Sequence, residues 1–286
     1  MTRVRVTIPY LMEKKVKHEQ ISMMTCYDYP MALLQEKAGI DIILCGDSLG
    51  MTVYGYQGTL PVTMDMMVVH SAAVKRGAAN SFVIGDMPFL SYQVSPQEAV
   101  RNAGRLMKES NVDCIKLEGG AVAVEAVKYI VNAGIPVMGH LGLTPQSTSA
   151  LGGFKAQGRS AEAAYRIIED AAALEAAGVC SILLEAIPPE VAKIITAESK
   201  VPIIGIGAGI HCDGQLLIVH DMLGFFDRFV PKFVKKYADM NGVILAALNQ
   251  YKEEVEKGLF PAKEHCYGMP DEELSKLKNM LHILTV

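Results

Sequence analysis

Short runs of apolar residues recur along the chain, and stretches of helical length separate most of them. The runs are apolar throughout rather than alternating, which is typical of parallel strands that are covered on both faces. β-Branched residues recur in them, as in "DIILC" and "VPIIGIG". This pattern predicts eight strands, at residues 21–26, 41–45, 81–85, 113–118, 135–140, 180–185, 201–207 and 216–221.

The stretches between the runs carry helix signals. "SPQEAVRNAGRLMKES" begins with Ser95 as a candidate N-cap, Pro96 at the first helical position and Glu98 three residues after the cap. "SAEAAYRIIEDAAALEAAG" has the apolar spacing of a helix and ends at Gly178. Strands that alternate with helices in this way predict a parallel sheet.

The number of strands favours an α/β fold of the (β/α)8 barrel, or TIM barrel, type over a doubly wound open sheet. The last unit is expected to be irregular, because only about ten residues separate the seventh and eighth predicted strands. A helix is predicted around residues 238–257, and the tail reads as a further amphipathic helix. We therefore expect one barrel domain over residues 1–270 and a helical extension over residues 271–286.

Composition agrees with a globular enzyme, since 50% of the 286 residues are hydrophobic and 20% are charged. The net charge is −4 with no basic or acidic block, so neither nucleic acid nor a membrane surface is an expected partner. The apolar runs are too short to cross a bilayer, and the N-terminus lacks a signal-peptide core. The six cysteines form no CxxC motif and no zinc-like cluster with histidine, which favours a reduced, cytoplasmic setting.

Polar residues stand at the ends of the predicted strands. The run "DIILC" leads into Gly46, Asp47 and Ser48, and the run "SFVIG" leads into Asp86. In a barrel the carboxyl ends of the strands surround the active site, so polar residues there are candidates for function. The full set of candidates is Asp47, Ser48, Asp86, Lys116, Glu118, His140 and Glu185.

Carboxylates from separate strands, with no cysteine among them, suit a hard divalent cation such as Mg2+. A cation held in this way can chelate a 2-oxo acid and stabilise the enolate that forms when the neighbouring carbon loses a proton. Glu185 ends an apolar strand, where desolvation is expected to raise its pKa towards that of a general base. Lys116 is a candidate partner for the carboxylate of the substrate.

Structural roles are open for most of these residues. Asp47 and Asp86 can be helix-capping or turn residues. Lys116 and Glu118 alternate within one strand and can form a structural ion pair. An isolated histidine such as His140 is often a hydrogen-bonded core residue. Only the glutamate that ends the sixth strand lacks an evident partner that would justify burying its charge.

Two glycine-containing segments give weaker indications. "GIGAG" at residues 205–209 fits only the start of the GxGxxG fingerprint, because Ile210 occupies the place of the last glycine. A tight turn after the seventh strand is the default interpretation. The segment 141–160 is too long for a simple connection, and its Lys155 and Arg159 suggest a mobile flap over a polar ligand. A solvated loop is the alternative.

Several linked motifs lie in order between residue 7 and the "FPAKEHCY" segment near residue 267: "GDSLGMTVYGYQGTLPVT", "GDMPFLSYQVSPQEAVRNAGRLMKE", "IKLEGG", "GHLGLTPQS", "GGFKAQGR" and "VPIIGIGAG". Together they closely resemble the ketopantoate hydroxymethyltransferase (3-methyl-2-oxobutanoate hydroxymethyltransferase) family. The resemblance implies a (β/α)8 barrel that transfers a hydroxymethyl group from 5,10-methylenetetrahydrofolate to 3-methyl-2-oxobutanoate. The product would be 2-dehydropantoate (ketopantoate), in pantothenate biosynthesis. It also implies Mg2+ as cofactor and a large homo-oligomer, typically a decamer.

Residue by residue, the resemblance implies three carboxylates at the metal, and two of them, Asp47 and Asp86, also face the substrate. Glu118 is the third, with a link that can run through water. Ser48 and Lys116 are implied as contacts to the oxo acid.

The resemblance also implies that Glu185 accepts the substrate proton, whereas His140 lies in the site without an assigned role. It assigns no residue to the folate. Two alternatives stay open from the sequence. One is a folate-independent, Mg-dependent oxo-acid lyase or mutase on the same barrel, and the other is a catalytically silent binding scaffold.

Overall fold

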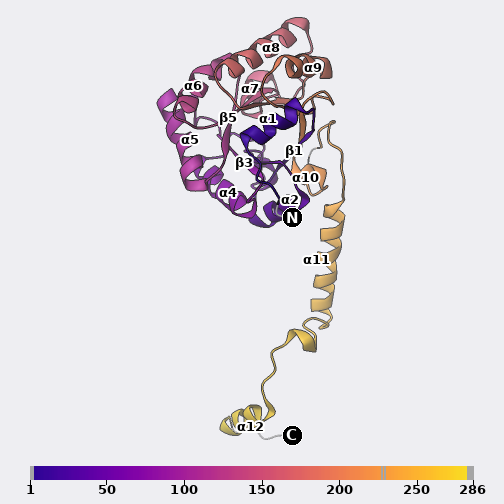
Figure 1. The fold of residues 1–286 in the computed structure, drawn as a ribbon. Coiled ribbons are helices and arrows are strands. Elements are labelled where there is room, and N and C mark those ends of the chain that lie inside the picture. The colour runs from indigo at the N-terminus through magenta and orange to yellow at the C-terminus, as the bar shows by residue number, and fades with distance from the viewer. Residues whose placement is uncertain (1–2, 227, 229, 282–286) are drawn as a thin grey trace. The chain divides into compact units, whose positions relative to one another are not determined.

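Eight parallel strands form a closed barrel in the computed structural model of the chain, which describes residues 3–226, 228 and 230–281 (Figure 1). Neighbouring strands pair in sequence order, and β1 pairs with β8 to close the ring. The predicted (β/α)8 barrel is thus confirmed. The strands are β1 (Ile21–Thr25), β2 (Ile42–Cys45), β3 (Phe82–Asp86), β4 (Cys114–Glu118), β5 (Val137–Gly142), β6 (Ser181–Glu185), β7 (Ile203–Ile206) and β8 (Gly214–Leu217).

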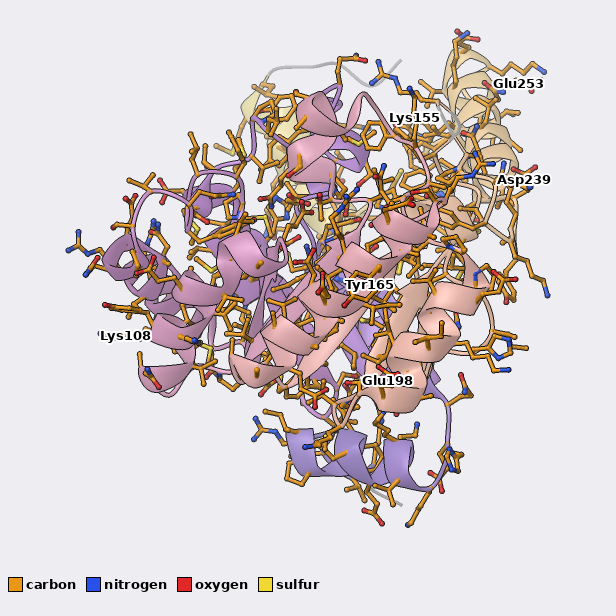
Figure 2. The ribbon with its side chains drawn as sticks, turned by 90° about the horizontal axis from the view of Figure 1, so that it is seen from above. Lys108, Lys155, Tyr165, Glu198, Asp239 and Glu253 are labelled. Atoms are coloured by element: carbon orange, nitrogen blue, oxygen red, sulfur yellow. The ribbon has the colours of Figure 1, made fainter. Side chains whose placement is uncertain are left out.

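Helices surround the barrel and connect its strands. The N-cap predicted for residues 95–110 is present, because the Ser95 side chain accepts a hydrogen bond from the amide of Glu98. Outward-facing side chains such as Lys108 and Tyr165 are exposed (Figure 2). The helices of the barrel unit are α1 (Ile8–Val16), α2 (Tyr29–Ala38), α3 (Leu49–Thr52), α4 (Met64–Gly77), α5 (Pro96–Ser110), α6 (Val124–Asn132), α7 (Thr148–Leu151), α8 (Ala161–Ala176), α9 (Pro189–Glu198) and α10 (Val219–Met222), with short 3-10 turns η1 (Ala121–Ala123) and η2 (Pro145–Ser147).

The core has two layers, because alternate residues of each strand point to opposite faces of the sheet. Ile42 and Leu44 of β2 belong to a cluster that also contains Leu11 of α1, so we place this cluster inside the barrel, with α1 at its amino-terminal end. Ile43 and Cys45 belong to the larger cluster that includes the buried faces of the helices. Burial on both faces explains the continuous apolar character of the strands.

The last part of the barrel departs from the regular pattern. Residues 207–213 connect β7 to β8 without a helix, as the short spacing predicted. The eighth strand lies at Gly214–Leu217 rather than at 216–221, because the end of the predicted run forms the short helix α10. The polar residues of that run, including Asp221, therefore stand on a helical turn above the strand.

Residues 239 onward form a second unit. The chain divides into the compact units Met1–Ala238 and Asp239–Val286. The second unit contains α11 (Met240–Glu256), the turn η3 (Lys263–His265) and α12 (Asp271–Met280), of which α11 and α12 lie where helices were expected. The domain boundary expected at residue 270 stays a prediction. No helix within the described ranges combines the length and the apolar character needed to cross a bilayer.

Candidate active site

A cavity of about 460 Å3 opens at the carboxyl ends of the strands. Its size is in the usual range for sites that bind small molecules. Every candidate residue from the sequence lines it, namely Asp47, Ser48, Asp86, Lys116, Glu118, His140 and Glu185. The structure thus brings together side chains that lie up to 138 positions apart, from 47 to 185.

Strand geometry explains how one strand supplies two of these groups. Lys116 and Glu118 are two positions apart on β4 and therefore point to the same face, into the pocket. Leu117 between them is fully buried in the outer layer of the core. A one-residue shift of register would exchange these faces and remove both charges from the site.

Four charged groups form the centre of the site. The Nζ of Lys116 lies 2.7 Å from Oδ1 of Asp86 and 3.9 Å from Oε1 of Glu118. The backbone amide of Asp47 donates a hydrogen bond of 3.0 Å to Oδ2 of Asp86. Lys116 is 3% exposed, so its charge requires the adjoining carboxylates. The ion pair that the sequence suggested between Lys116 and Glu118 is present, but Asp86 is the closer partner of Lys116.

Burial and neighbouring charges act on the pKa values of Asp47 and Asp86. Burial, followed by the charge of Asp86, raises the pKa of Asp47 well above its usual range. Burial likewise raises the pKa of Asp86, although the ammonium of Lys116 works against this change. A cation added beside these two adjacent carboxyl groups would favour the ionised form of both and so oppose the effect of burial.

Gln146 joins two of the carboxylates. Its side-chain nitrogen donates to Oδ2 of Asp47 at 2.9 Å, and its backbone amide donates to Oε2 of Glu118 at 3.0 Å. Its side-chain oxygen accepts a hydrogen bond of 2.8 Å from the hydroxyl of Tyr92. These bonds fix which end of the amide faces Asp47. Asp47 does not cap the following helix α3, because Ser48 occupies the N-cap position and no side chain makes a capping hydrogen bond there.

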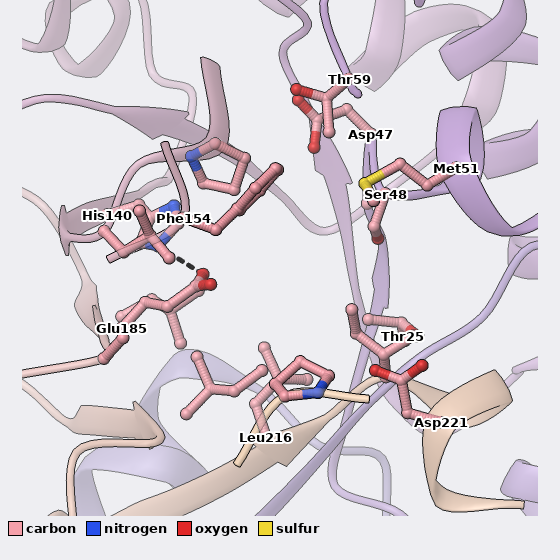
Figure 3. A pocket seen from close by; sticks show the side chains of 18 of the residues that line it. Thr25, Asp47, Ser48, Met51, Thr59, His140, Phe154, Glu185, Leu216 and Asp221 are labelled. Carbon is pink, nitrogen blue, oxygen red and sulfur yellow. Dashed lines mark ion pairs between the residues drawn. The ribbon is translucent and has the colours of Figure 1, made fainter. Parts of the chain in front are cut away.

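His140 lies between two glutamates. Its Nδ1 is 3.3 Å from Oε1 of Glu118, and its Nε2 is 3.2 Å from Oε2 of Glu185 (Figure 3). Burial and the charge of Lys116 oppose protonation, but the two carboxylates outweigh them and raise the pKa of His140 to about 9. His140 therefore carries a positive charge at neutral pH. It is the partner of Glu185 that the sequence did not indicate.

The side chain of Ser48 makes a hydrogen bond with the buried Tyr27. The hydroxyl of Tyr27 lies 2.8 Å from Oγ of Ser48, and Tyr27 is 1% exposed. The link joins the segments that follow two neighbouring strands, β1 and β2. The geometry aims the serine into the pocket, where it is one of the lining residues.

Sequence reasoning missed four residues of this site: Tyr27, Tyr92, Gln146 and Asp221. Gln146 follows the fifth strand in "GHLGLTPQS", close enough to a strand end to have been a candidate. Asp221 closes the eighth predicted run, so the rule that selected Asp47 and Asp86 would have selected it as well. Nothing in the local sequence marks either tyrosine.

The residues present fit a hard divalent cation. Within the described part of the chain, Asp47, Asp86 and Glu118 offer buried carboxylate oxygens, of which Oδ1 of Asp86 faces the ammonium of Lys116 and Oε1 of Glu118 faces the ring of His140. Across that same part, no three acidic, histidine or cysteine side chains are grouped closely enough to enclose an ion by themselves. Mg2+ is commonly bound by one or two carboxylates together with water and substrate, so this partial set suits it.

Solved structures with the same architecture confirm the barrel. A phosphonopyruvate hydrolase in complex with oxalate and Mg++ aligns with a TM-score of 0.59 at 11% identity, covering 97% of this chain and 98% of that one. A 2,3-dimethylmalate lyase of the PEP mutase/isocitrate lyase superfamily aligns with a TM-score of 0.56 at 14% identity, covering 96% and 98%. At these identities the likeness concerns the fold alone.

Sequence comparison is more specific. Residues 5–263 match the family described as ketopantoate hydroxymethyltransferase. A protein named 3-methyl-2-oxobutanoate hydroxymethyltransferase from Syntrophomonas wolfei is 55% identical over 273 residues, which cover 96% of this chain and 99% of that protein. One of the same name from Moorella thermoacetica is 56% identical over 265 residues, covering 93% and 98%. The chain belongs to the ketopantoate hydroxymethyltransferase family.

Proposed function

We propose that this protein transfers a hydroxymethyl group from 5,10-methylenetetrahydrofolate to 3-methyl-2-oxobutanoate and releases 2-dehydropantoate, as a step of pantothenate biosynthesis. The observation that carries the proposal is the group of buried carboxylates beside Glu185, in a chain that matches hydroxymethyltransferases over nearly its whole length. The folate-independent lyase or mutase is not favoured, because a lyase and a hydrolase match only at 14% and 11% identity.

Binding of the oxo acid involves the positive and hydroxyl groups of the site. The substrate is an anion, and Lys116 presents an ammonium to the pocket while its partner Asp86 keeps that ammonium charged and in place. Ser48, oriented by Tyr27, donates a hydrogen bond to a substrate oxygen. Two fixed contacts of this kind hold the reacting carbon in one orientation.

Asp47, Asp86 and Glu118 would hold Mg2+, as the fit of the carboxylates supports. When bound, the cation would polarise the keto oxygen of the substrate and so make the neighbouring carbon more acidic. Gln146 fixes the positions of the Asp47 and Glu118 carboxylates relative to each other, because its side chain donates to the first and its backbone amide donates to the second. This positioning matters because ligand geometry depends on such supporting bonds.

Glu185 acts as the general base. Its carboxylate receives the proton from C3 of the oxo acid, and the electron pair of that C–H bond passes to the carbonyl. Water adds to the methylene carbon of the folate, the bonds from that carbon to N5 and N10 break, and the two protons of the water pass to these nitrogens, so tetrahydrofolate leaves and formaldehyde remains. C3 then forms a bond to the formaldehyde carbon, and the formaldehyde oxygen takes the proton held by Glu185 and becomes the new hydroxyl. The charged His140 at 3.2 Å holds the carboxylate of Glu185 in place.

The test is ketopantoate formation in the presence and absence of the folate, with and without a chelator. We expect product only when methylenetetrahydrofolate and a divalent cation are both present. Glu185→Gln is expected to lower turnover on the order of 10²- to 10⁴-fold, the usual contribution of a general base. Product without the folate would favour a lyase or mutase, and full activity of Glu185→Gln would remove that residue from the mechanism.

Two properties of the whole protein stay predictions: a homo-oligomer and a cytoplasmic setting. The apolar side chains exposed on α11, such as Leu245 and Leu248, support contact with a further copy. All six cysteines are free, as expected in a reducing compartment. Light scattering coupled to size-exclusion chromatography measures the assembly directly.

A further inference from the structure

Asp221 is a buried acid that the proposed mechanism does not use. It stands on α10, directly after the last strand, and is 4% exposed. It lines the same cavity as the metal-binding carboxylates, across the pocket from His140 and Glu185 (Figure 3). Within the part of the chain that the structure describes, its carboxylate makes no hydrogen bond and no ion pair.

Such a group is unfavourable in the protein alone. Burial raises the pKa of Asp221 to about 6, and the charge of Lys236 offsets only part of this effect. A buried carboxylate without a partner costs free energy that a neutral side chain of the same size does not. The carboxylate lines the cavity, so a hydrogen-bond donor of a bound ligand can pair with it.

The oxo acid cannot be that ligand. 3-Methyl-2-oxobutanoate carries a carboxylate and a keto oxygen, which only accept hydrogen bonds, and its negative charge is repelled by Asp221. A five-carbon acid at the metal also leaves much of a cavity of about 460 Å3 unfilled. The remaining space belongs to a second molecule that carries N–H or O–H donors.

Apolar side chains that could pack against a flat ring line the cavity that Asp221 shares. Met51, Phe226, Val230 and Phe233 line this cavity and are predominantly apolar. A carboxylate at the edge of an apolar slot accepts two parallel N–H donors that lie in the plane of a ring. A reduced pteridine presents such a pair, the ring N3–H and the 2-amino group.

We propose that Asp221 is a specificity-determining residue for the one-carbon donor, and that its carboxylate accepts hydrogen bonds from N3–H and the 2-amino group of the pteridine ring. This inference rests on the proposed function and deepens it. The pocket then has two ends with different tasks. The strand-borne carboxylates and Lys116 bind the oxo acid, and Asp221 binds the folate.

The first test measures tetrahydrofolate binding by calorimetry, which requires no turnover. Asp221→Asn keeps the shape of the side chain but presents only one acceptor, so we expect the dissociation constant to rise roughly 10- to 100-fold. Glu190→Gln is the matched control, because it removes one negative charge from an exposed position at the start of α9. Unchanged tetrahydrofolate affinity in Asp221→Asn would overturn the inference.

The second test separates this inference from the proposed function. Deuterium exchange at C3 of 3-methyl-2-oxobutanoate, with Mg2+ and without folate, reports on the other end of the pocket. We expect Asp221→Asn to exchange within about twofold of the unmodified protein while its KM for methylenetetrahydrofolate rises. If Asp221→Asn lost exchange by the same factor as it lost affinity for the folate, Asp221 would have a general structural role, and the inference would be overturned. Absence of exchange in the unmodified protein would contradict the proposed function instead.

A chemical substitution on the ligand completes the test. The 2-desamino-2-methyl analogue of tetrahydrofolate lacks the amino donor. We expect the unmodified protein to bind this analogue roughly tenfold more weakly than tetrahydrofolate, and Asp221→Asn to bind the two ligands with nearly equal affinity. An equal penalty in both proteins would mean that the amino group is recognised elsewhere, and the inference would fall.

Discussion

Asp221 shows what a single unpaired carboxylate does to a fold. Its side chain is buried, yet no donor in the described chain compensates it, so ionisation is less favourable in the folded protein than in the unfolded one. A residue with this property lowers stability at neutral pH and is retained for another reason. Stability and ligand recognition therefore make opposite demands on this position.

The replacement Asp221→Asn is expected to stabilise the protein above pH 6. In the folded protein the pKa of Asp221 is about 6, above its ordinary value of 3.8, so the unmodified protein carries the full free-energy cost of ionising this buried group above pH 6. The cost disappears as the pH falls from 6 towards 4, and the two melting temperatures should converge over this interval. Thermal unfolding of both proteins between pH 4.5 and 8 checks this. A constant difference across the range would contradict the assignment.

Gln146 is expected to support the metal from outside its ligand shell. Gln146→Met removes the donor to Asp47, and the affinity for Mg2+ should fall roughly 10-fold, as for other partners of metal ligands. Titration calorimetry with Mg2+ measures the change. Thr148→Val is the control, because the hydroxyl of Thr148 donates to the carbonyl of Pro145 in the same segment. Equal Mg2+ affinity in the two variants would show that Gln146 has no such role.

Among the residues of the site, those at the ends of strands were predicted from the sequence, whereas those that lie in loops were missed. Asp47, Asp86 and Glu118 follow from one rule, since barrel strands end at the site. The partners of these residues depend on closure of the barrel, and the bond from Gln146 to Asp47 joins positions 99 residues apart. No local pattern encodes a contact of that kind.

The elements were predictable to within about two residues for seven of the strands, because a strand that is buried on both faces has an uninterrupted apolar run. The eighth strand was less well predicted. "LLIVHD" continues as an apolar run past the end of β8, and the chain turns into α10 at Val219. Short apolar runs do not by themselves distinguish a strand from a turn of helix.

Gly142, the last residue of β5, is expected to tolerate no side chain. Its φ is +93°, and an added Cβ would lie 2.2 Å from the carbonyl oxygen of Glu185. Gly142→Ala should therefore lower the free energy of unfolding by about 2–4 kcal/mol and displace the catalytic glutamate. Urea unfolding and the ketopantoate assay measure the two effects.

Gly104→Ala is the matched control for this prediction. Gly104 lies within α5, and an added Cβ would have no atom within 4 Å. The change should stabilise the protein by about 0.5–1 kcal/mol, because alanine favours a helix more than glycine does. Equal effects of the two replacements would refute the explanation from the Gly142 backbone.

For the whole molecule, the binding of a cation should be linked to stability. Asp47 and Asp86 repel each other in the folded barrel, and the unfolded chain has no preformed site. Mg2+ at about 100 times its dissociation constant should add ~2.7 kcal/mol to the free energy of unfolding. Thermal unfolding in MgCl2 and in chelator measures this. Identical melting curves, or an equal shift in Asp47→Asn, would contradict the proposed ligands.

The irregular end of the barrel also bears on how such a protein changes over evolutionary time. The wall around Asp221 is built by chain that follows β8, including Phe226, Val230 and Phe233, whereas the acid-base centre stands on β3 to β6 and the turn after β2. Replacements in that terminal wall leave the inner ring of strands intact. After gene duplication, a paralogue would therefore acquire a new second substrate there while its chemistry on oxo acids is inherited unchanged.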